Sequence, residues 1–212
     1  GNEGGNIRYA RNEVSTSGAE ENVSMSVESR FGKRSGVATI NEFDDKSLEK
    51  VVRRSEEIAR LAPESPEYIE LLGPQQYITT KAHFDSTAKI DPAYRADAAA
   101  KSIKAATDKG LTAAGFLEHY TRFMAKMNNK GLFAYHPSTS VDFSVTMRTD
   151  DGTGSGYVTQ DFSDVSKLDT GKASQIAADK AANSRNARAL EPGKYTVILE
   201  PAASVDLLRN MF

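Results

Sequence analysis

The sequence predicts an α+β fold, in which an antiparallel or mixed β-sheet meander packs with about three helices. Two observations predict it. Residues 114–163 contain successive segments of alternating apolar and polar side chains separated by turn residues, which is the pattern of strands joined in hairpins. Stretches of helical periodicity lie between such hairpin runs and do not alternate with single strands, which disfavours a doubly wound parallel sheet.

The first forty residues favour strands. Ile7–Val14 is predicted as one strand, and Val23, Met25 and Val27 repeat at the two-residue period of a second. Phe31–Arg34 is a turn, after which Gly36–Ile40 returns as a partner strand. We therefore expect a single strand followed by a hairpin.

The next region predicts two helices joined by a loop. The first begins at Asp44 or Asp45, either of which can cap it, and Pro63 ends it. Residues 63–90 are loop-like because of their prolines. The predicted buried stripe of this helix is Leu48, Val51, Val52, Ile58, Ala59 and Ala62.

Asp91 and Pro92 are typical of the N-cap and first position of the second helix, and Gly110 is placed to end it. Its small side chains predict close packing against a flat surface such as a sheet. The predicted stripe is Ala96, Ala99, Ala100, Ile103 and Ala106.

The meander follows, with its clearest strand at Val141–Met147. Asn128–Gly131 and Asp150–Gly156 supply turns, and a strand returns from Tyr157. A third helix carries Ala173, Ile176, Ala177, Lys180, Ala181 and Ser184 on one side. Pro192-Gly193 breaks the regular structure, and Tyr195–Glu200 is predicted as a short strand.

Composition excludes several classes of protein. Lys+Arg 27 against Asp+Glu 29 gives a formal charge of −2, which disfavours direct binding of nucleic acid. No apolar run approaches the roughly 20 residues that span a bilayer, so we expect no membrane segment. There is no cysteine, hence no disulfide framework and no thiolate zinc site, which fits a cytoplasmic location. The chain starts at Gly1 without methionine and stops in an apolar stretch at Leu207–Phe212, so we expect a fragment.

No residue combination predicts a metal or catalytic site. The three histidines, His83, His119 and His136, form no His-Glu-x-x-His pair that would place two imidazoles on one helix face. His83 and Asp85 would share a face of a strand, but a surface histidine is the simpler interpretation. We therefore predict no catalytic, cofactor-binding or metal-binding residue in this chain.

Two further clusters have structural explanations. Gly152-x-Gly154-x-Gly156 lies between strands and lacks the lysine of a phosphate-binding loop, so a hairpin turn is favoured. Ser155 has glycines at the wrong spacing for a nucleophile elbow. The basic cluster Arg30, Lys33 and Arg34 could hold a carboxylate or phosphate, but a solvated turn is the more common reading.

The order of several segments resembles the TldD/PmbA family over nearly the whole chain from about Ile7. Ser35–Asp44 and the helix to Ile58-Ala59-Arg60 look like the family's first hairpin and helix. Leu190–Ala203 is similar to the entry of the family's C-terminal domain and is the most specific match. The central strands are matched by Ala113–Phe116, Asn128–Leu132 and Asp151–Tyr157.

The resemblance implies a zinc peptidase subunit or its non-catalytic partner. In the peptidase-type subunit, the strand matching Tyr195–Glu200 leads into a His-Glu-x-x-x-His helix that holds zinc. Here Arg209 and Asn210 stand where His-Glu would begin, and neither can act as the ligand or the general base. The departure points to the PmbA-like (TldE) subunit.

We therefore expect residues 1–190 to form an N-terminal α+β domain and residues 191–212 to begin a truncated C-terminal domain. The resemblance implies a non-catalytic subunit of a zinc metallopeptidase, forming a dimer with a TldD-like subunit that holds the zinc, or with itself, and acting on unfolded or extended peptides. One alternative is a regulatory protein that modulates DNA gyrase by binding protein, not DNA. Another is an independent metallopeptidase with ligands beyond Phe212.

Overall fold

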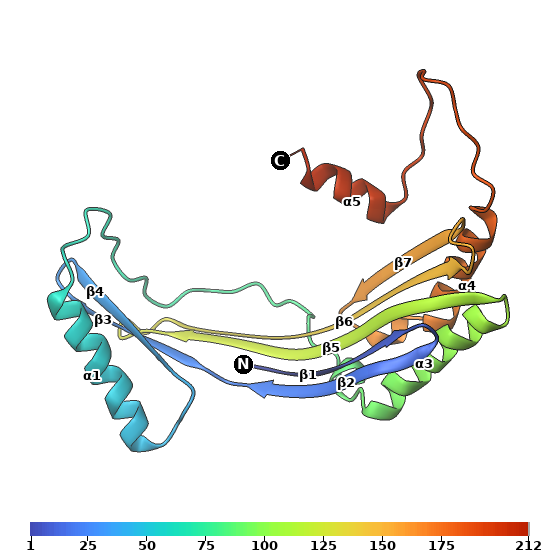
Figure 1. Ribbon diagram of the computed structural model, residues 1–212. Coiled ribbons are helices and arrows are strands. Elements are labelled where there is room, and N and C mark those ends of the chain that lie inside the picture. The colour runs from blue at the N-terminus through green and yellow to red at the C-terminus, as the bar shows by residue number, and fades with distance from the viewer. Residues whose placement is uncertain (212) are drawn as a thin grey trace. The chain divides into compact units, whose positions relative to one another are not determined.

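The computed structural model describes residues 1–211 and divides into two compact units. The first unit consists of Gly1–Glu3, Glu20–Lys81 and Arg122–Pro137, and the second of Gly4–Ala19, Ala82–Thr121 and Ser138–Phe212. The chain is an α+β protein, as predicted, because a mostly antiparallel sheet combines with five helices (Figure 1).

Five strands form the main sheet in the order β2-β1-β5-β6-β7. They are β1 (Asn2–Ala10), β2 (Glu13–Asn22), β5 (Leu111–Met127), β6 (Phe133–Thr149) and β7 (Ser155–Phe162). In the β6–β7 hairpin, Val145 lies opposite Val158, and Met147 lies opposite Gly156. Strands β5, β6 and β7 are the predicted meander, and the turns at Asn128–Gly131 and Asp150–Gly156 join them.

In the first unit, a hairpin packs against a helix. Strands β3 (Met25–Phe31) and β4 (Arg34–Ile40) pair antiparallel, as predicted, and α1 (Asp45–Leu61) contacts both. The Asp44 side chain accepts a hydrogen bond from the Ser47 N–H and caps the helix. Only Val51, Ser55 and Ala59 of α1 are buried, so the predicted stripe was too wide, and Val52 is exposed.

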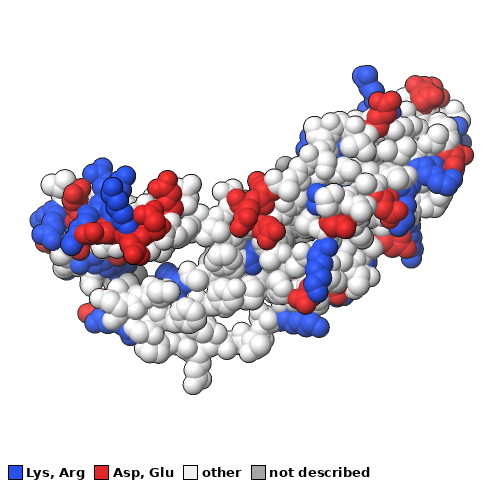
Figure 2. Space-filling model, turned by 90° about the horizontal axis from the view of Figure 1, so that it is seen from below, with Lys and Arg blue, Asp and Glu red and all other residues white. Residues whose placement is uncertain are grey.

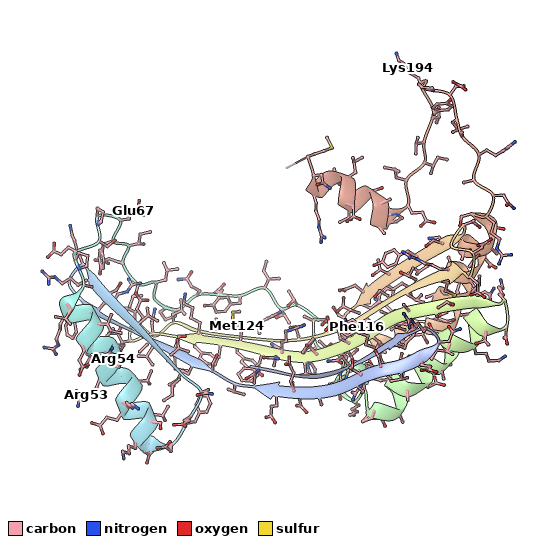
Figure 3. The ribbon with its side chains drawn as sticks, viewed as in Figure 1. Arg53, Arg54, Glu67, Phe116, Met124 and Lys194 are labelled. Carbon is pink, nitrogen blue, oxygen red and sulfur yellow. The ribbon has the colours of Figure 1, made fainter. Side chains whose placement is uncertain are left out.

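The outer side of α1 carries charges of both signs. Arg53 pairs with Glu49 and Glu56, and Arg54 pairs with Glu57. Figure 2 shows Lys, Arg, Asp and Glu interspersed over this region, and Figure 3 labels Arg53 and Arg54. Such mixed pairs on a helix surface stabilise it only slightly, because solvent screens them.

In the second unit, α3 (Pro92–Thr107) and α4 (Thr170–Asn183) pack together over the sheet. Their caps are Asp91, which was predicted, and Asp169. Alanines let both helices approach the sheet closely, which confirms the packing expected for α3. The core consists of Ile7, Tyr9, Leu111, Ala113, Leu117, Val141, Phe143, Val145 and Met147 of the sheet with Ile90, Ala98, Ala99, Ala106, Leu168, Ala173, Ala177, Ala178 and Ala181.

The buried face of α3 differs from the prediction in an informative way. The buried residues are Arg95, Ala98, Ala99, Ser102 and Ala106, whereas Ala96 and Ala100 are exposed. The prediction selected only apolar side chains, and the true stripe includes a serine and an arginine at helical spacing. The preference for apolar side chains also misassigned α4. Ile176 was predicted on the buried side but is exposed, whereas Ser174 is buried.

Two predicted strands are wrong. Ile7–Val14 contains the turn of a hairpin, because Arg11 and Asn12 both have positive φ, as a two-residue turn between twisted strands requires. The Asn12 side chain compensates by accepting from the Ala113 N–H (2.7 Å) and donating to the Leu111 carbonyl oxygen (3.0 Å). This turn was not predicted because it contains no glycine, the usual residue at positive φ.

The second wrong strand is Tyr195–Glu200, which has no strand partner in the structure and is followed by α5 (Pro201–Arg209). Its high β-propensity has no effect where no neighbouring strand is present to pair with it. Of two short helical segments, α2 (Asp85–Ala88) lies in the region predicted as a loop, and η1 (Val165–Lys167) lies between the predicted meander and the third helix. They contact each other in the second unit.

Candidate functional site

The three histidines have separate surroundings. His83 Nε2 lies 3.5 Å from Asp85 Oδ1, so the predicted proximity of these two residues is real, although they lie at the start of α2 and not on a strand. His136 is exposed on β6, and His119 is buried on β5. Within residues 1–211 no group of three or more His, Asp or Glu could hold a metal ion.

The residues at the expected zinc position do not fit a metal. Arg209 is the last residue of α5, and the Asn210 side chain donates to the Asp206 carbonyl oxygen at 2.8 Å. A guanidinium only donates hydrogen bonds, so Arg209 cannot be a ligand. The side-chain bond of Asn210 serves as a cap of the helix end.

The basic cluster of the first hairpin is engaged by the chain itself. Arg30 pairs with Glu28 at 2.8 Å and donates to the Ile69 carbonyl oxygen, and Arg34 donates to that of Arg60. The Arg60 guanidinium lies 4.6 Å from the centre of the Phe31 ring. These contacts agree with the turn interpretation and leave the carboxylate or phosphate hypothesis without a specific observation.

The glycine-rich turn is a hairpin turn, as predicted. Asp151 accepts hydrogen bonds from the Thr149 hydroxyl and from Thr153, which lowers the pKa of its carboxyl to about 2. Gly156 is required for another reason. A Cβ there would lie 2.0 Å from the Ala177 carbonyl oxygen, so the glycine lets α4 lie directly on β7.

Close packing of α4 brings the side chains of Lys180 and of the C-cap residue Ser184 to the edge of β7 that faces away from β6. The Ser184 hydroxyl accepts from the Ser155 N–H at 2.9 Å and donates to the Ser155 carbonyl oxygen at 3.0 Å. Lys180 Nζ donates to the Tyr157 carbonyl oxygen at 3.0 Å and to Glu200 at 2.5 Å. The first half of this edge is thus closed by the chain's own side chains.

An open groove of about 670 Å³ lies at this edge. Strand β7, the C-terminal end of helix α4, Glu200 and helix α5 line it. The lining residues include Tyr157, Lys180, Asn183, Ser184, Glu200 and Asp206. Within the groove a cation and a carboxylate, Lys180 and Glu200, are already paired with each other.

The other edge of the sheet, β2, is different. All ten residues of β2 are exposed. The strand contains no lysine and no proline, which commonly protect an edge from pairing with another chain, and its charged residues are Glu13, Glu20 and Glu21, close to its two ends. Because the turn at Arg11 and Asn12 makes Ala10 and Glu13 a hydrogen-bonded pair, the N–H groups of Val14, Thr16 and Gly18 point away from β1.

Two sequence models of PmbA/TldA metallopeptidases match the chain. The model of domain 1 matches residues 1–59, and the model of the central domain matches residues 81–185. The chain belongs to the PmbA/TldD family. The resemblance deduced from segment order is thereby confirmed.

Solved structures of three proteins share the fold of this PmbA/TldD member. TldE from Thermococcus kodakarensis has a TM-score of 0.74 at 17% identity, over 85% of this chain and 42% of that one. A proposed modulator of a DNA gyrase from Thermotoga maritima has a TM-score of 0.74 at 14% sequence identity, and the match covers 91% of this chain and 44% of that one. A proposed modulator of DNA gyrase from Bacteroides thetaiotaomicron has a TM-score of 0.74 at 16% sequence identity, and the match covers 99% of this chain and 50% of that one.

The chain therefore spans between 42% and 50% of the length of these related structures. A search of curated proteins found no match. No helix within residues 1–211 is long and apolar enough to cross a membrane.

Sequence reasoning missed three residues that the structure brings to notice, namely Arg95, Lys180 and Ser184. Lys180 and Ser184 were assigned to one side of the third helix, and their spacing of four residues was a usable signal. Arg95 interrupts an alanine-rich segment at a position that helical spacing from Ala98, Ala99 and Ala106 makes buried. A charged residue, Arg95, at a helical position that is expected to be buried was the feature that could have revealed it.

Proposed function

We propose that this chain is part of a PmbA/TldE-like, non-catalytic subunit that pairs with a TldD-like zinc peptidase subunit. The observation that carries the proposal is the pair Arg209 and Asn210, a cation and a capping amide at the end of α5, where a zinc subunit would begin its ligand helix. In the proposed complex the TldD-like partner holds the zinc. Residues 191–212 are then the opening of a C-terminal domain, and the assembly works in the cytoplasm.

The role of this half is to form part of the enclosure and to hold unfolded or extended peptides. Strand addition supports this role, because an edge strand offers backbone donors and acceptors regardless of sequence. Strand β2 offers its outward N–H groups over its exposed length, whereas Ser184 and Lys180 close half of β7. We therefore assign peptide binding to β2.

Mixing the full-length protein with a TldD-like subunit tests the pairing. We expect co-elution in size-exclusion chromatography and faster cleavage of an unfolded peptide than by the TldD-like subunit alone. Zinc measured in each purified subunit should be found in the partner. Absence of a complex together with unchanged cleavage would contradict the proposal.

A pair of proline variants tests the edge. Thr16→Pro removes an outward N–H of β2, and Thr159→Pro removes one from β7, while an edge strand tolerates proline at such positions. We expect the first to weaken binding of a fluorescent unfolded peptide in anisotropy titrations and the second to leave it unchanged. Equal binding by both variants would rule out β2.

The family also contains proteins described as modulators of DNA gyrase, which supports a second candidate role as a regulatory binding protein. The nearly balanced charge argues that the contact would be with protein. A pull-down with gyrase at physiological salt, beside a DNA titration over a range of salt concentrations, separates this role from peptide binding. A third candidate, an independent metallopeptidase with its own ligands, predicts zinc in the full-length protein without a partner.

A further inference from the structure

The side chains of β2 form two rows, because successive residues of a strand point to opposite faces of the sheet. Ser15 and Ser17 belong to the first row. Their hydroxyls donate to carbonyl oxygens of the neighbouring strand β1, to that of Arg8 at 3.1 Å and to that of Asn6 at 2.9 Å. This row is therefore engaged by the chain itself and presents only small polar groups to a strand that pairs with β2.

The second row consists of Val14, Thr16 and Gly18, whose N–H groups point away from β1. It lies on the face of the sheet that carries the core, because Val14 is the neighbour of the buried Tyr9 across the hairpin turn. Val14 is nevertheless 52% exposed. An apolar side chain of a paired strand would cover Val14 and remove apolar surface from water.

Gly18 leaves an open notch in the second row. It lies beside Gly5 of β1, since a Cβ on Gly5 would be 3.0 Å from the Gly18 carbonyl oxygen. The space over Gly5 is filled by the guanidinium of Arg95, whose Nη1 would lie 2.5 Å from that Cβ and is held 3.0 Å from Nε2 of His119. Over Gly18 the only atom of residues 1–211 within 4 Å of a Cβ would be Asn6 Nδ2, at 3.9 Å. The Gly18 notch is thus open to a side chain from another strand.

The Glu13 carboxylate stands at the turn end of the same edge without a partner. No cation within residues 1–211 forms an ion pair with it. Glu20, towards the other end, already accepts a hydrogen bond from the Asn2 amide at 3.2 Å. Towards an added antiparallel strand, Glu13 occupies a non-hydrogen-bonded position, where opposite Cα atoms approach to about 4.5 Å and side chains lie closest. Charge complementarity therefore favours a cation opposite Glu13.

We propose that the β2 edge selects an extended peptide in which an aromatic residue is followed, five positions later, by Lys or Arg. Antiparallel pairing sets this order, because Gly18 and Glu13 are five positions apart and the peptide runs in the opposite direction. The aromatic ring covers the backbone at the Gly18 notch, as aromatic side chains do opposite glycines of edge strands. The residue before the cation faces Val14 and is apolar. The inference rests on the proposed function, in which β2 holds extended peptides by strand addition.

Fluorescence anisotropy with a short series of labelled peptides tests the preference. The parent peptide is Phe-Ser-Thr-Ser-Val-Lys between flexible Gly-Ser flanks, with both ends blocked. A second peptide has serine in place of phenylalanine, and a third has glutamate in place of lysine. Each replacement should raise the Kd for the chain by about two- to fivefold, the effect of one cross-strand pair. This series needs no variant of the protein.

Two protein variants assign the aromatic preference to the notch. Gly18→Val fills the notch but keeps the outward N–H, so the parent and the serine peptide should bind equally well. Thr16→Val introduces the same side chain two positions away in the same row and is the matched control, in which the two- to fivefold difference should persist. Loss of the difference in both variants would contradict the assignment to Gly18.

A charge reversal tests the other end of the edge. Glu13→Lys should invert the preference, so that the glutamate peptide binds more tightly than the parent. An unchanged order of the two peptides would show that Glu13 does not face the cation and would overturn that part of the proposal.

Failure of the selection and failure of strand addition give different results. Equal binding of all three peptides, lost in Thr16→Pro, would leave strand addition at β2 intact and overturn the selection alone. Absence of binding by every peptide would overturn the assignment of peptide binding to β2, and the selection with it.

Discussion

Gly36 of β4 lies directly against the backbone of α1 at Ala59. A Cβ on Gly36 would lie 2.2 Å from the Ala59 backbone nitrogen and 2.5 Å from the Ser55 carbonyl oxygen. The neighbouring hydroxyls of Ser29 and Ser55 lie 2.6 Å apart and join the hairpin to the helix. The helix can rest on the hairpin only because this position has no side chain.

Gly36→Ala should therefore destabilise the first unit. The clash is with backbone atoms, which cannot rotate away, so we expect a cost of about 1–3 kcal/mol in the free energy of unfolding. Urea titration followed by circular dichroism measures it. Gly18→Ala is the control, since the nearest atom to its Cβ would be 3.9 Å away, and a comparable loss in both variants would contradict the packing argument.

The stability of the second unit should depend on pH through His119. The pKa of His119 is about 4 in the folded chain and near 6.5 when unfolded, so the unfolded chain binds more protons between these values. The contribution is complete above pH 6.5 and is lost as the pH falls towards 4, to a limit of about 3 kcal/mol. His119→Gln should flatten this part of the pH profile in denaturant titrations, whereas the exposed His136→Gln should leave it unchanged.

The Ser184 hydroxyl should control exposure of the β7 edge. Ser184→Ala removes the acceptor of the Ser155 N–H, and a net hydrogen bond of about 1 kcal/mol corresponds to roughly fivefold faster amide exchange. Hydrogen exchange followed by NMR can resolve this single amide. The Val158 amide, on the side of β7 that pairs with β6, should keep its rate, and acceleration of both amides would indicate general loosening.

The N-cap of α3 should contribute measurably to stability. The Asp91 side chain accepts from the Tyr94 N–H at 2.8 Å, so Asp91→Ala should cost about 1 kcal/mol. Asp97 in the same helix forms only an exposed pair with Lys101, and Asp97→Ala should cost less than about 0.5 kcal/mol. Thermal unfolding of the two variants side by side gives the comparison.

Patterns of side-chain periodicity and caps determined much of the secondary structure in advance. The alternation at Val141–Met147 and the caps at Asp44 and Asp91 depend on local geometry, which the sequence states directly. The turn at Arg11 and Asn12 and the missing strand at Tyr195–Glu200 depend on neighbours, namely Ala113 in one case and an absent pairing strand in the other. No local pattern could reveal them.

The sequence by itself determined the family and the α+β class, and it predicts that Arg209 and Asn210 stand in place of the zinc-binding pair. Only the tertiary structure decided which face of α3 is buried, and with it that Arg95 lies beside His119. It also showed that Ser184 and Lys180 close half of the β7 edge, whereas β2 is exposed over its whole length. The physical reason is that periodicity fixes the spacing of side chains within an element, but burial and pairing depend on contacts with elements distant in sequence.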